Sequence, residues 1–344
     1  MRWISYRVIM KKFAVLFFAF LASISASAYD HFFVFGDSLS DVGNAPNTRD
    51  LNYGGRWSNG SVWCEYLAVK LGLTPAANSA NYSAGDTFAT NNINFAYGGA
   101  MTSFGTTSLT GIPSVNEQIF GKKNALDHVT DLTKGFDRYG LNFSENDLVA
   151  TWAGANNLFF AVGSDYGALA SAAADDMIAN LEQLILRGAK NLLILNLPDI
   201  GTTPSYVADA EGAANATLFS KTFNDILGEG VALLQASYLD VDFMYINIFD
   251  MFNEMINDAA AYGFQYTETS LLDAFGNANP PTDEEAAQYL FYDSVHPTTA
   301  GHKLLADLIY AQIPEPSHYA AMFGFAALCV AMIRKKLKCS KTSA

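Results

Sequence analysis

The chain has 344 residues, half of them hydrophobic, and it carries 34 Asp and Glu residues against 20 Lys and Arg residues. This length allows one large α/β domain with a sizeable core, or two small domains. A net charge of −14 argues against binding to nucleic acid and against electrostatic docking on anionic lipid.

The first 28 residues have the pattern of a secretory signal peptide. Basic residues at 2, 7, 11 and 12 precede an apolar run at 13–21, and Ala26-Ser27-Ala28 supplies an A-x-A cleavage site. We therefore expect signal peptidase to cleave after Ala28. An uncleaved membrane anchor is the alternative, but the apolar run is short for a bilayer span, which takes about 20 residues.

Residues 313–344 have the pattern of a second processing signal. Pro314-Glu315-Pro316 precedes an apolar stretch at 319–333 and a basic cluster at 334–338, which suits the cytoplasmic side of a membrane. This order resembles the PEP-CTERM sorting signal, with its Pro-Glu-Pro motif, short transmembrane segment and basic tail. The resemblance implies a Gram-negative bacterium and cleavage by an exosortase. The protein would be exported to the periplasm or outer surface, or secreted after processing, with only transient anchoring by this segment.

Residues 29–312 are the predicted domain body. They keep 11 Lys and Arg residues against 33 Asp and Glu residues, a net charge of −22. Cys64 is the only cysteine in this body, so no internal disulfide can form, and the helical pattern around it favours core packing over a reactive thiol. We find no internal repeat and no linker that divides the body.

Apolar runs alternate with helical patterns along this body. We predict strands at 32–35, 93–97, 148–152, 191–196 and 243–248. We predict helices at 62–73, 166–187, 214–238 and from 297 to about 312, a short helix within 111–123, and helical fragments with loops at 249–292. Continuous apolar strands separated by helices are typical of a parallel sheet that is covered on both faces, so the fold class is α/β.

Glycines and polar residues follow three of the predicted strands. Ser38 lies on the turn after the first strand, where its hydroxyl would stand clear of the carboxyl edge of the sheet, the usual place for chemistry in open α/β sheets. The glycines at 98–99 follow the second strand and could offer N–H groups to a ligand, although an ordinary turn also explains them. Asn156 and Asn157 follow the third strand.

Ser38, Asp293 and His296 could form a catalytic triad. Serine hydrolysis needs an imidazole that takes and returns the serine proton, and a carboxylate that fixes the imidazole tautomer. Asp293 and His296 lie three residues apart on a loop before a helix that Pro297 opens, since proline is favoured in a first helical turn. One rigid corner could therefore supply both groups.

The oxyanion that forms in such a reaction needs N–H donors aimed at it. Candidates are the Ser38 N–H, a glycine N–H at 98–99 and the Asn156 side-chain amide. Purely structural roles are the alternative: Asp293 and His296 could form a local cap, and Ser38 and Asn156 could be ordinary turn residues. A metal site from His296, His302 and Asp293 fits no standard ligand spacing. The remaining histidines fit a catalytic role less well: His31, His128, His302 and His318.

Several sequence blocks resemble those of the GDSL (SGNH) hydrolases, in the same order. They are GDSLSDVGN at 36–44, NFAYGGA at 94–100, GANN at 154–157 and DSVHP at 293–297. GRWSNG at 55–60, LPDIGTTP at 197–204 and YGF at 262–264 resemble the lipase/esterase branch. The resemblance spans about residues 31–312. It implies a three-layer α/β/α, flavodoxin-like fold with a parallel sheet of about five strands.

The resemblance also implies roles for individual residues. Ser38 would be the nucleophile, His296 the base and Asp293 its orienting acid. The oxyanion donors would be the N–H groups of Ser38 and Gly99 and the side chain of Asn156.

Two details of the match concern single positions. Gly99 is preferred to Gly98 because the family's donor glycine lies five residues after the asparagine of its block, here Asn94. Asn157 stands where the family usually has Asp, which removes one charge beside the site without changing a proposed catalytic group.

We therefore expect a serine ester hydrolase of the carboxylesterase/lipase type that works through an acyl-enzyme on Ser38 and needs no metal or organic cofactor. Its substrate would be a lipid ester or an acetylated polysaccharide. A polysaccharide O-acetylesterase is the alternative enzyme, suggested by the exopolysaccharide association that the tail implies. A non-catalytic surface binding module on the same fold is the alternative from another class. An apolar acyl groove could be lined by Phe104, Phe159, Phe160 and Phe264.

Overall fold

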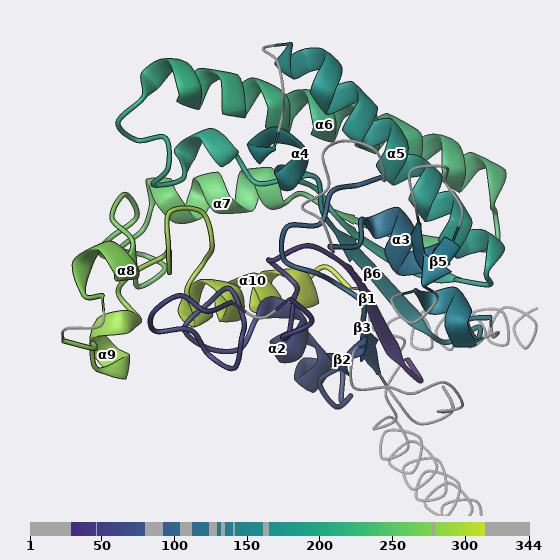
Figure 1. The fold of residues 1–344 in the computed structure, drawn as a ribbon, viewed down its shortest axis with the longest axis horizontal. Coiled ribbons are helices and arrows are strands. Elements are labelled where there is room, and N and C mark those ends of the chain that lie inside the picture. Colours follow the sequence, from purple (N-terminus) through teal and green to yellow (C-terminus); the bar gives the residue numbers. More distant parts are fainter. Residues whose placement is uncertain are drawn as a thin grey trace, which may run out of the picture. The chain divides into compact units, whose positions relative to one another are not determined.

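Six parallel strands form the central sheet (Figure 1). In spatial order they are β2 (Ala77–Asn78), β3 (Ile93–Asn94), β1 (Phe32–Gly36), β6 (Leu148–Trp152), β7 (Asn191–Leu195) and β8 (Asp242–Ile246). When the two-residue edge strand β2 is left out and the other five strands are renumbered 1 to 5 in chain order, their order across the sheet is 2-1-3-4-5. This order is flavodoxin-like. The predicted α/β fold class is confirmed, with β2 added to the predicted five strands.

The computed structural model describes the body of the chain. The described residues are 29–45, 47–79, 92–103, 112–123, 129–131, 135–139, 142–160, 165–276 and 279–313. Tyr29–Gln312 forms one compact unit. The predicted signal peptide, and the predicted sorting signal beyond its first residue, lie outside the described residues. Within the described part, no helix has the length and apolarity to cross a membrane.

Helices cover both faces of the sheet (Figure 1). Over one face lie α3 (Val115–Phe120), α5 (Tyr166–Leu186) and α6 (Ala210–Ser237), with α5 packed along α6. Over the other face, α2 (Trp63–Lys70) packs against α10 (Thr299–Tyr310). The remaining elements are short: α4 (Ala155–Phe159), α7 (Ile248–Asn257), α8 (Leu271–Ala274), α9 (Asp283–Ala286), the 3-10 helices η4 (Phe136–Tyr139) and η5 (Ile200–Thr202), and an antiparallel pair, β4 (Lys122–Lys123) with β5 (Val129–Asp131).

Strand β1 supplies core to both layers, because successive side chains of a strand point to opposite faces. Phe33 and Phe35 pack into the cluster formed with α3, α5 and α6. Phe32 meets Trp63 of α2 edge to face, with 6.4 Å between ring centroids. All five residues of β1 and of β6 are buried, as expected for parallel strands with helices on both faces.

The predicted strand at 93–97 is shorter in the structure. β3 ends at Asn94, although the N–H groups of Phe95 and Tyr97 donate to the carbonyls of Val34 and Gly36 at 2.7 and 3.1 Å. The segment therefore stays beside β1 up to the glycine pair, and this contact delivers the pair to the carboxyl edge of the sheet.

Capping side chains set two helix starts that differ from the predictions. α6 begins four residues early, at Ala210, because the Asp209 carboxylate accepts the Gly212 N–H at 3.0 Å. In α10 the N-cap is Thr298, whose hydroxyl accepts the N–H of residue 301 at 3.3 Å. Pro297 therefore lies before the helix. The prediction that it stands in the first helical turn is wrong.

Cys64 lies in the core, and the prediction of a packing role is confirmed. Its sulfur is 3.7 Å from the carbonyl oxygen of Ser40, and the residue is buried and forms no disulfide. Burial raises the pKa of the thiol well above its usual value, so the reactive thiolate is disfavoured.

His302 of α10 is a buried imidazole with no hydrogen-bond partner among the residues that the structure describes. Burial, with the nearby charge of His296 as a smaller cause, lowers the pKa of His302 to about 3. The side chain is therefore neutral in the folded protein at any pH well above that value.

We predict that His302 makes the protein less stable in acid. Below about pH 6.5 the unfolded chain binds a proton on this side chain, whereas the folded chain does so only near pH 3, so each pH unit between them lowers the free energy of unfolding by up to about 1.4 kcal/mol. His302→Leu removes this contribution. The free energy of unfolding, measured with denaturant from neutral to mildly acidic pH, should fall less steeply with decreasing pH in the variant than in the wild type. Parallel pH dependences for the two proteins would contradict this account.

Candidate active site

Ser38 lies on a tight turn directly after β1. The strand ends at Gly36, where a Cβ would lie 2.4 Å from the carbonyl oxygen of Trp152 on β6, so only glycine permits this close approach. Beyond it, the Leu39 N–H donates to the Asp37 carboxylate at 3.0 Å and tightens the turn. The serine therefore lies at the carboxyl edge of the sheet, near the boundary between β1 and β6. From β1 the chain continues to β3 on one side, and from β6 it continues to β7 and β8 on the other side, so this boundary is the topological switch point.

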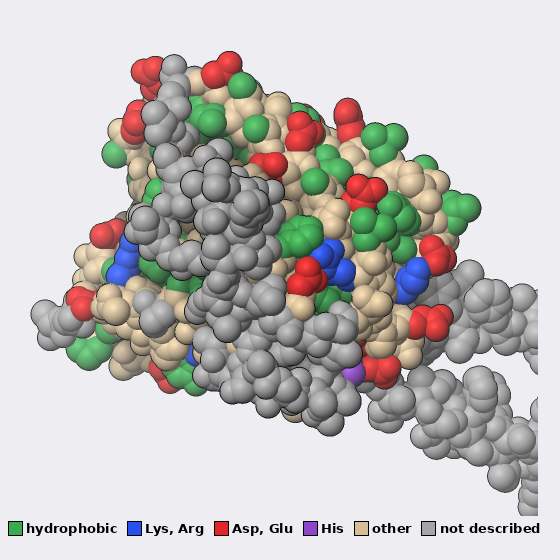
Figure 2. Space-filling view, turned by 45° about the vertical axis from the view of Figure 1, so that its right-hand side comes forward, with side chains coloured by type: hydrophobic (Ala, Val, Ile, Leu, Met, Phe, Trp, Pro, Cys, Tyr) green, Lys and Arg blue, Asp and Glu red, His purple; other side chains and the backbone are tan. Residues whose placement is uncertain are grey.

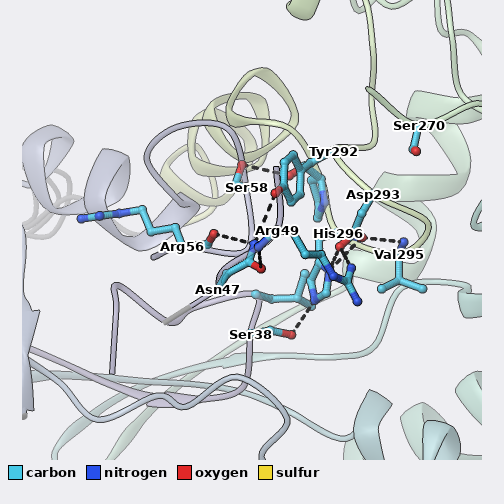
Figure 3. Close-up of polar contacts among 12 residues, drawn as sticks. Ser38, Asn47, Arg49, Arg56, Ser58, Ser270, Tyr292, Asp293, Val295 and His296 are labelled. Carbon is cyan, nitrogen blue, oxygen red and sulfur yellow. Dashed lines mark hydrogen bonds and ion pairs between the residues drawn. The ribbon is translucent and has the colours of Figure 1, made fainter. Parts of the chain in front are cut away.

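The side chains of Ser38, His296 and Asp293 form a continuous chain of hydrogen bonds (Figure 3). His296 Nε2 is 2.7 Å from Ser38 Oγ, and His296 Nδ1 is 2.8 and 2.9 Å from the two carboxylate oxygens of Asp293. The three residues are only 7%, 8% and 3% exposed. The structure thus brings together the side chains that the sequence proposed as nucleophile, base and acid.

Asp293 is held as an ionised acceptor. The backbone N–H groups of Val295 and His296 donate to its Oδ1 at 3.0 and 2.8 Å. Burial alone would raise the pKa of Asp293, but the charge and ring N–H of His296, together with these backbone donors, outweigh burial and hold the pKa well below its usual range. A carboxylate that accepts from Nδ1–H leaves Nε2 free to accept the serine proton.

The glycine pair meets the site in an asymmetric way. The Gly98 N–H donates to the Asp41 carboxylate at 2.7 Å, whereas the Gly99 N–H has no acceptor among the described residues. Gly99 has a φ of +84°, a conformation that favours glycine. Since Gly98 is already engaged, the available donor is the one at Gly99, the position that the sequence comparison preferred.

Asp41 ties this glycine pair to the turn that carries the serine. Besides Gly98, it accepts the N–H groups of Gly43, Asn44 and Ala45 at 2.8, 2.6 and 2.9 Å. Burial raises the pKa of Asp41 to about 6, although these donors oppose the rise. This bracing role of Asp41 could not be predicted from the sequence, because its partners lie on two separate segments.

Asn156 lies at the start of α4, beside the same cavity. One of its amide N–H groups donates to the carbonyl of Ala100 at 3.0 Å, which fixes the side chain and leaves the second N–H for a ligand. Ser38, Gly99 and Asn156 all line one cavity. The three predicted oxyanion donors therefore lie around a common space, with the serine hydroxyl beside it.

Comparison with known proteins identifies the family. The family model described as "GDSL-like Lipase/Acylhydrolase" matches residues 32–309, most of the chain. The chain belongs to this family.

Similar proteins come from plants and bacteria. The anther-specific proline-rich protein APG of Arabidopsis thaliana is 26% identical over 321 residues, covering 79% of this chain and 59% of APG. A phosphatidylcholine-sterol acyltransferase of Aeromonas hydrophila is 25% identical over 335 residues, covering 83% of this chain and 90% of the relative. A solved acetyl xylan esterase structure has a TM-score of 0.42 at 13% identity, covering 83% of this chain and 100% of that chain. The chain spans 59% and 50% of the length of two curated relatives that it matches.

At Asn157 the chain departs from the usual GDSL pattern. Asn157 Oδ1 accepts the Thr102 N–H and its Nδ2 donates to the Thr102 hydroxyl, both at 3.1 Å. The neutral amide thus holds the segment that follows the glycine pair. A carboxylate could accept from the same N–H and the same hydroxyl, so this departure keeps the contact and removes only the charge.

Two further residues, which sequence reasoning missed, contact the triad. Arg49 Nη1 contacts Asp293 Oδ2, and the guanidinium lies 5.2 Å from the centroid of the Trp57 ring. The Trp57 ring in turn lies 5.2 Å from that of His296. Both residues come from the loop before α2, and no spacing in a single sequence links that loop to residues 293–296.

Asp37, beside the nucleophile, was also missed. Its Oδ1 accepts the Leu39 N–H, but its Oδ2 has no partner among the described residues. Burial is the largest influence and raises the pKa of Asp37 to about 7. Burial therefore favours the neutral form of this acid, which limits the negative charge behind Ser38.

A cavity of about 330 Å³ opens in front of Ser38. Phe159 and Phe160 line it, as predicted for an acyl groove. Phe264 is buried and does not line this cavity, so that part of the prediction is wrong. Phe104 lies outside the described residues.

The other described histidines lie away from the serine. His31 pairs with Asp147 at 2.8 Å, and His302 lies in the core. His128 and His318 lie outside the described residues. Over the part of the chain that the structure describes, no three His, Cys, Asp or Glu side chains are grouped as a metal site requires.

Proposed function

We propose that this protein hydrolyses carboxylic esters through an acyl-enzyme on Ser38. The observation that carries the proposal is the hydrogen-bonded chain from Ser38 Oγ through His296 to the Asp293 carboxylate. The ionised Asp293 carboxylate fixes the tautomer of the His296 ring, and the opposite ring nitrogen faces the Ser38 hydroxyl.

The first half of the reaction transfers the acyl group. His296 Nε2 takes the Ser38 proton as Oγ attacks the ester carbonyl, and the carbonyl oxygen becomes an oxyanion. The N–H groups of Ser38 and Gly99 and the Asn156 amide line the space in which that charge develops. By analogy with other hydrolases, each such donor lowers the barrier by about 3–4 kcal/mol. His296 then gives its proton to the alcohol, which leaves.

The second half releases the acid. Water donates a proton to His296 Nε2 and attacks the acyl carbonyl, and the breakdown of the second oxyanion returns the proton to Ser38 Oγ. Phe159 and Phe160 offer an apolar wall to the acyl group. This wall supports a lipid-type ester over an acetylated polysaccharide as the substrate.

Hydrolysis of 4-nitrophenyl esters from acetate to palmitate tests the proposal. The folded full-length protein should hydrolyse them, and Ser38→Ala should lower kcat by about 10⁴-fold or more, because triad members act as a unit. Ser237→Ala, on the exposed end of α6, is the matched control and should keep its activity.

The preferred chain length distinguishes the substrate classes. An optimum at longer acyl chains supports a lipid ester, and an optimum at acetate supports the O-acetylesterase. Full activity in Ser38→Ala would contradict the role of Ser38 as the nucleophile. A folded wild-type protein that leaves every ester intact would contradict the mechanism and favour a binding module.

We also propose that the protein is exported. The support is the signal-peptide pattern at 1–28 and the PEP-CTERM pattern at 313–344. A reporter that carries residues 313–344 behind a signal peptide should be processed in cells that contain an exosortase and stay intact in cells that lack it. Identical processing in both strains would contradict the sorting role.

A further inference from the structure

We infer that Arg49 binds an anionic group on the alcohol part of the ester. This inference rests on the proposed ester hydrolysis and concerns which esters the site prefers. The residue is not needed to complete the triad geometry, since Asp293 already receives two backbone N–H groups and the His296 ring N–H. Its position in the cavity points to a second role.

The alcohol must leave along the face of His296. The imidazole returns its proton to the leaving oxygen, so that oxygen lies within hydrogen-bond reach of Nε2. Trp57 packs against the same imidazole, and the Arg49 guanidinium lies over the Trp57 ring. Because Arg49 and Trp57 both line the cavity with Ser38, groups attached to the leaving oxygen meet this pair.

The guanidinium is both fixed and accessible. Asp293 engages its Nη1 and Trp57 supports one face, yet the Arg49 side chain is 48% exposed. Its Nε and Nη2 have no acceptor among the residues that the structure describes. A guanidinium presents its N–H groups in a planar fork that matches carboxylate and phosphate oxygens. Since the side chain is already held in place, binding an anion orders little more of it.

Arg49 is a cation in a protein whose body is strongly acidic. Arg49 is the only Lys or Arg among the described residues that line the cavity. The body carries a net charge of −22, and Asp and Glu side chains are spread over the face seen in Figure 2, with Lys and Arg at few places. Such a surface repels anionic substrates, so a cation at the cavity offsets the repulsion where the alcohol binds. A neutral ester would gain nothing from it.

The lining of the cavity therefore defines a substrate class. Phe159 and Phe160 offer apolar surface to the acyl group, and Arg49 offers a cation to the alcohol. The preferred ester carries a phosphate or a carboxylate a few bonds from its alcohol oxygen.

Matched acetate esters test this inference. Methyl 4-acetoxybenzoate has a neutral alcohol part, whereas 4-acetoxybenzoate and 4-acetoxyphenyl phosphate carry a carboxylate and a phosphate at the same position. For each anionic ester, the kcat/KM ratio to the neutral ester is measured in the wild type, Arg49→Gln and Arg49→Lys. Because each ratio is compared between proteins, differences in intrinsic ester reactivity cancel.

Arg49→Gln should lower the ratio for at least one anionic ester about tenfold, the value of one charge-assisted hydrogen bond. The ester with the larger change identifies carboxylate or phosphate as the group. Arg49→Lys should keep part of the preference, since the charge remains without the fork, and added salt should weaken it. Arg56→Gln is the matched control, because Arg56 lies on the same loop, pairs with Glu65 at 2.7 Å and does not line the cavity.

Three outcomes would overturn the inference. If Arg49→Gln lowers kcat/KM equally for all three esters, Arg49 only positions Asp293. In that case the pH dependence of kcat/KM for the neutral ester should also differ between Arg49→Gln and the wild type. If Arg56→Gln changes the ratios as much as Arg49→Gln, the effect is one of overall charge. The neutral ester separates the two proposals, because its Ser38-dependent hydrolysis supports the function even when the anion preference fails. If the wild type hydrolyses none of the esters, both proposals fall.

Discussion

The hydrogen bond between His296 Nε2 and Ser38 Oγ is the contact on which the rest of the site depends. It joins residues 258 positions apart, so it exists only when the whole sheet has assembled. Gly36 allows the end of β1 to lie close to the backbone of β6, and it thereby fixes the position of Ser38 at the edge of the sheet. On the other side, two backbone N–H groups and the His296 ring fix the Asp293 carboxylate. Chemistry at Ser38 is therefore a property of the assembled fold, which is why a short motif alone does not establish it.

The loop before α2 fixes the two halves of this site to each other. Its Ser58 hydroxyl donates to the carbonyl of Pro297 at 3.0 Å, and its Asn59 side chain accepts the Thr299 N–H at 2.9 Å. The Tyr292 hydroxyl donates to a carbonyl of the same loop at 2.6 Å, and Figure 3 shows Ser58 and Tyr292 near the triad. The segment that carries the acid and the base is thereby clamped by the loop that delivers Arg49 and Trp57. Specificity for the alcohol and orientation of the base consequently depend on one set of contacts.

Much of the fold could be predicted from local patterns. The strands β1, β6 and β7 are continuous apolar runs bounded by glycine or polar residues, so their positions follow from periodicity and composition. β2 could not be predicted, because a two-residue strand is defined only by its partner β3. The capping role of Thr298 moved Pro297 out of the helix, and a proline pattern does not distinguish these two positions. For the site, motif order indicated the triad and its donors, whereas Arg49 and Asp41 act through contacts that arise only in the folded chain.

The central claim is that His296 and Asp293 activate Ser38 as a nucleophile, and covalent labelling tests it most directly. The full-length protein is treated with an aryl fluorophosphonate, and peptide mass spectrometry locates and times the adduct. We expect a single adduct on Ser38, formed about 10³–10⁴-fold more slowly in His296→Ala and Asp293→Asn. An adduct on another side chain, or labelling of Ser38 at an unchanged rate in those variants, would contradict the account.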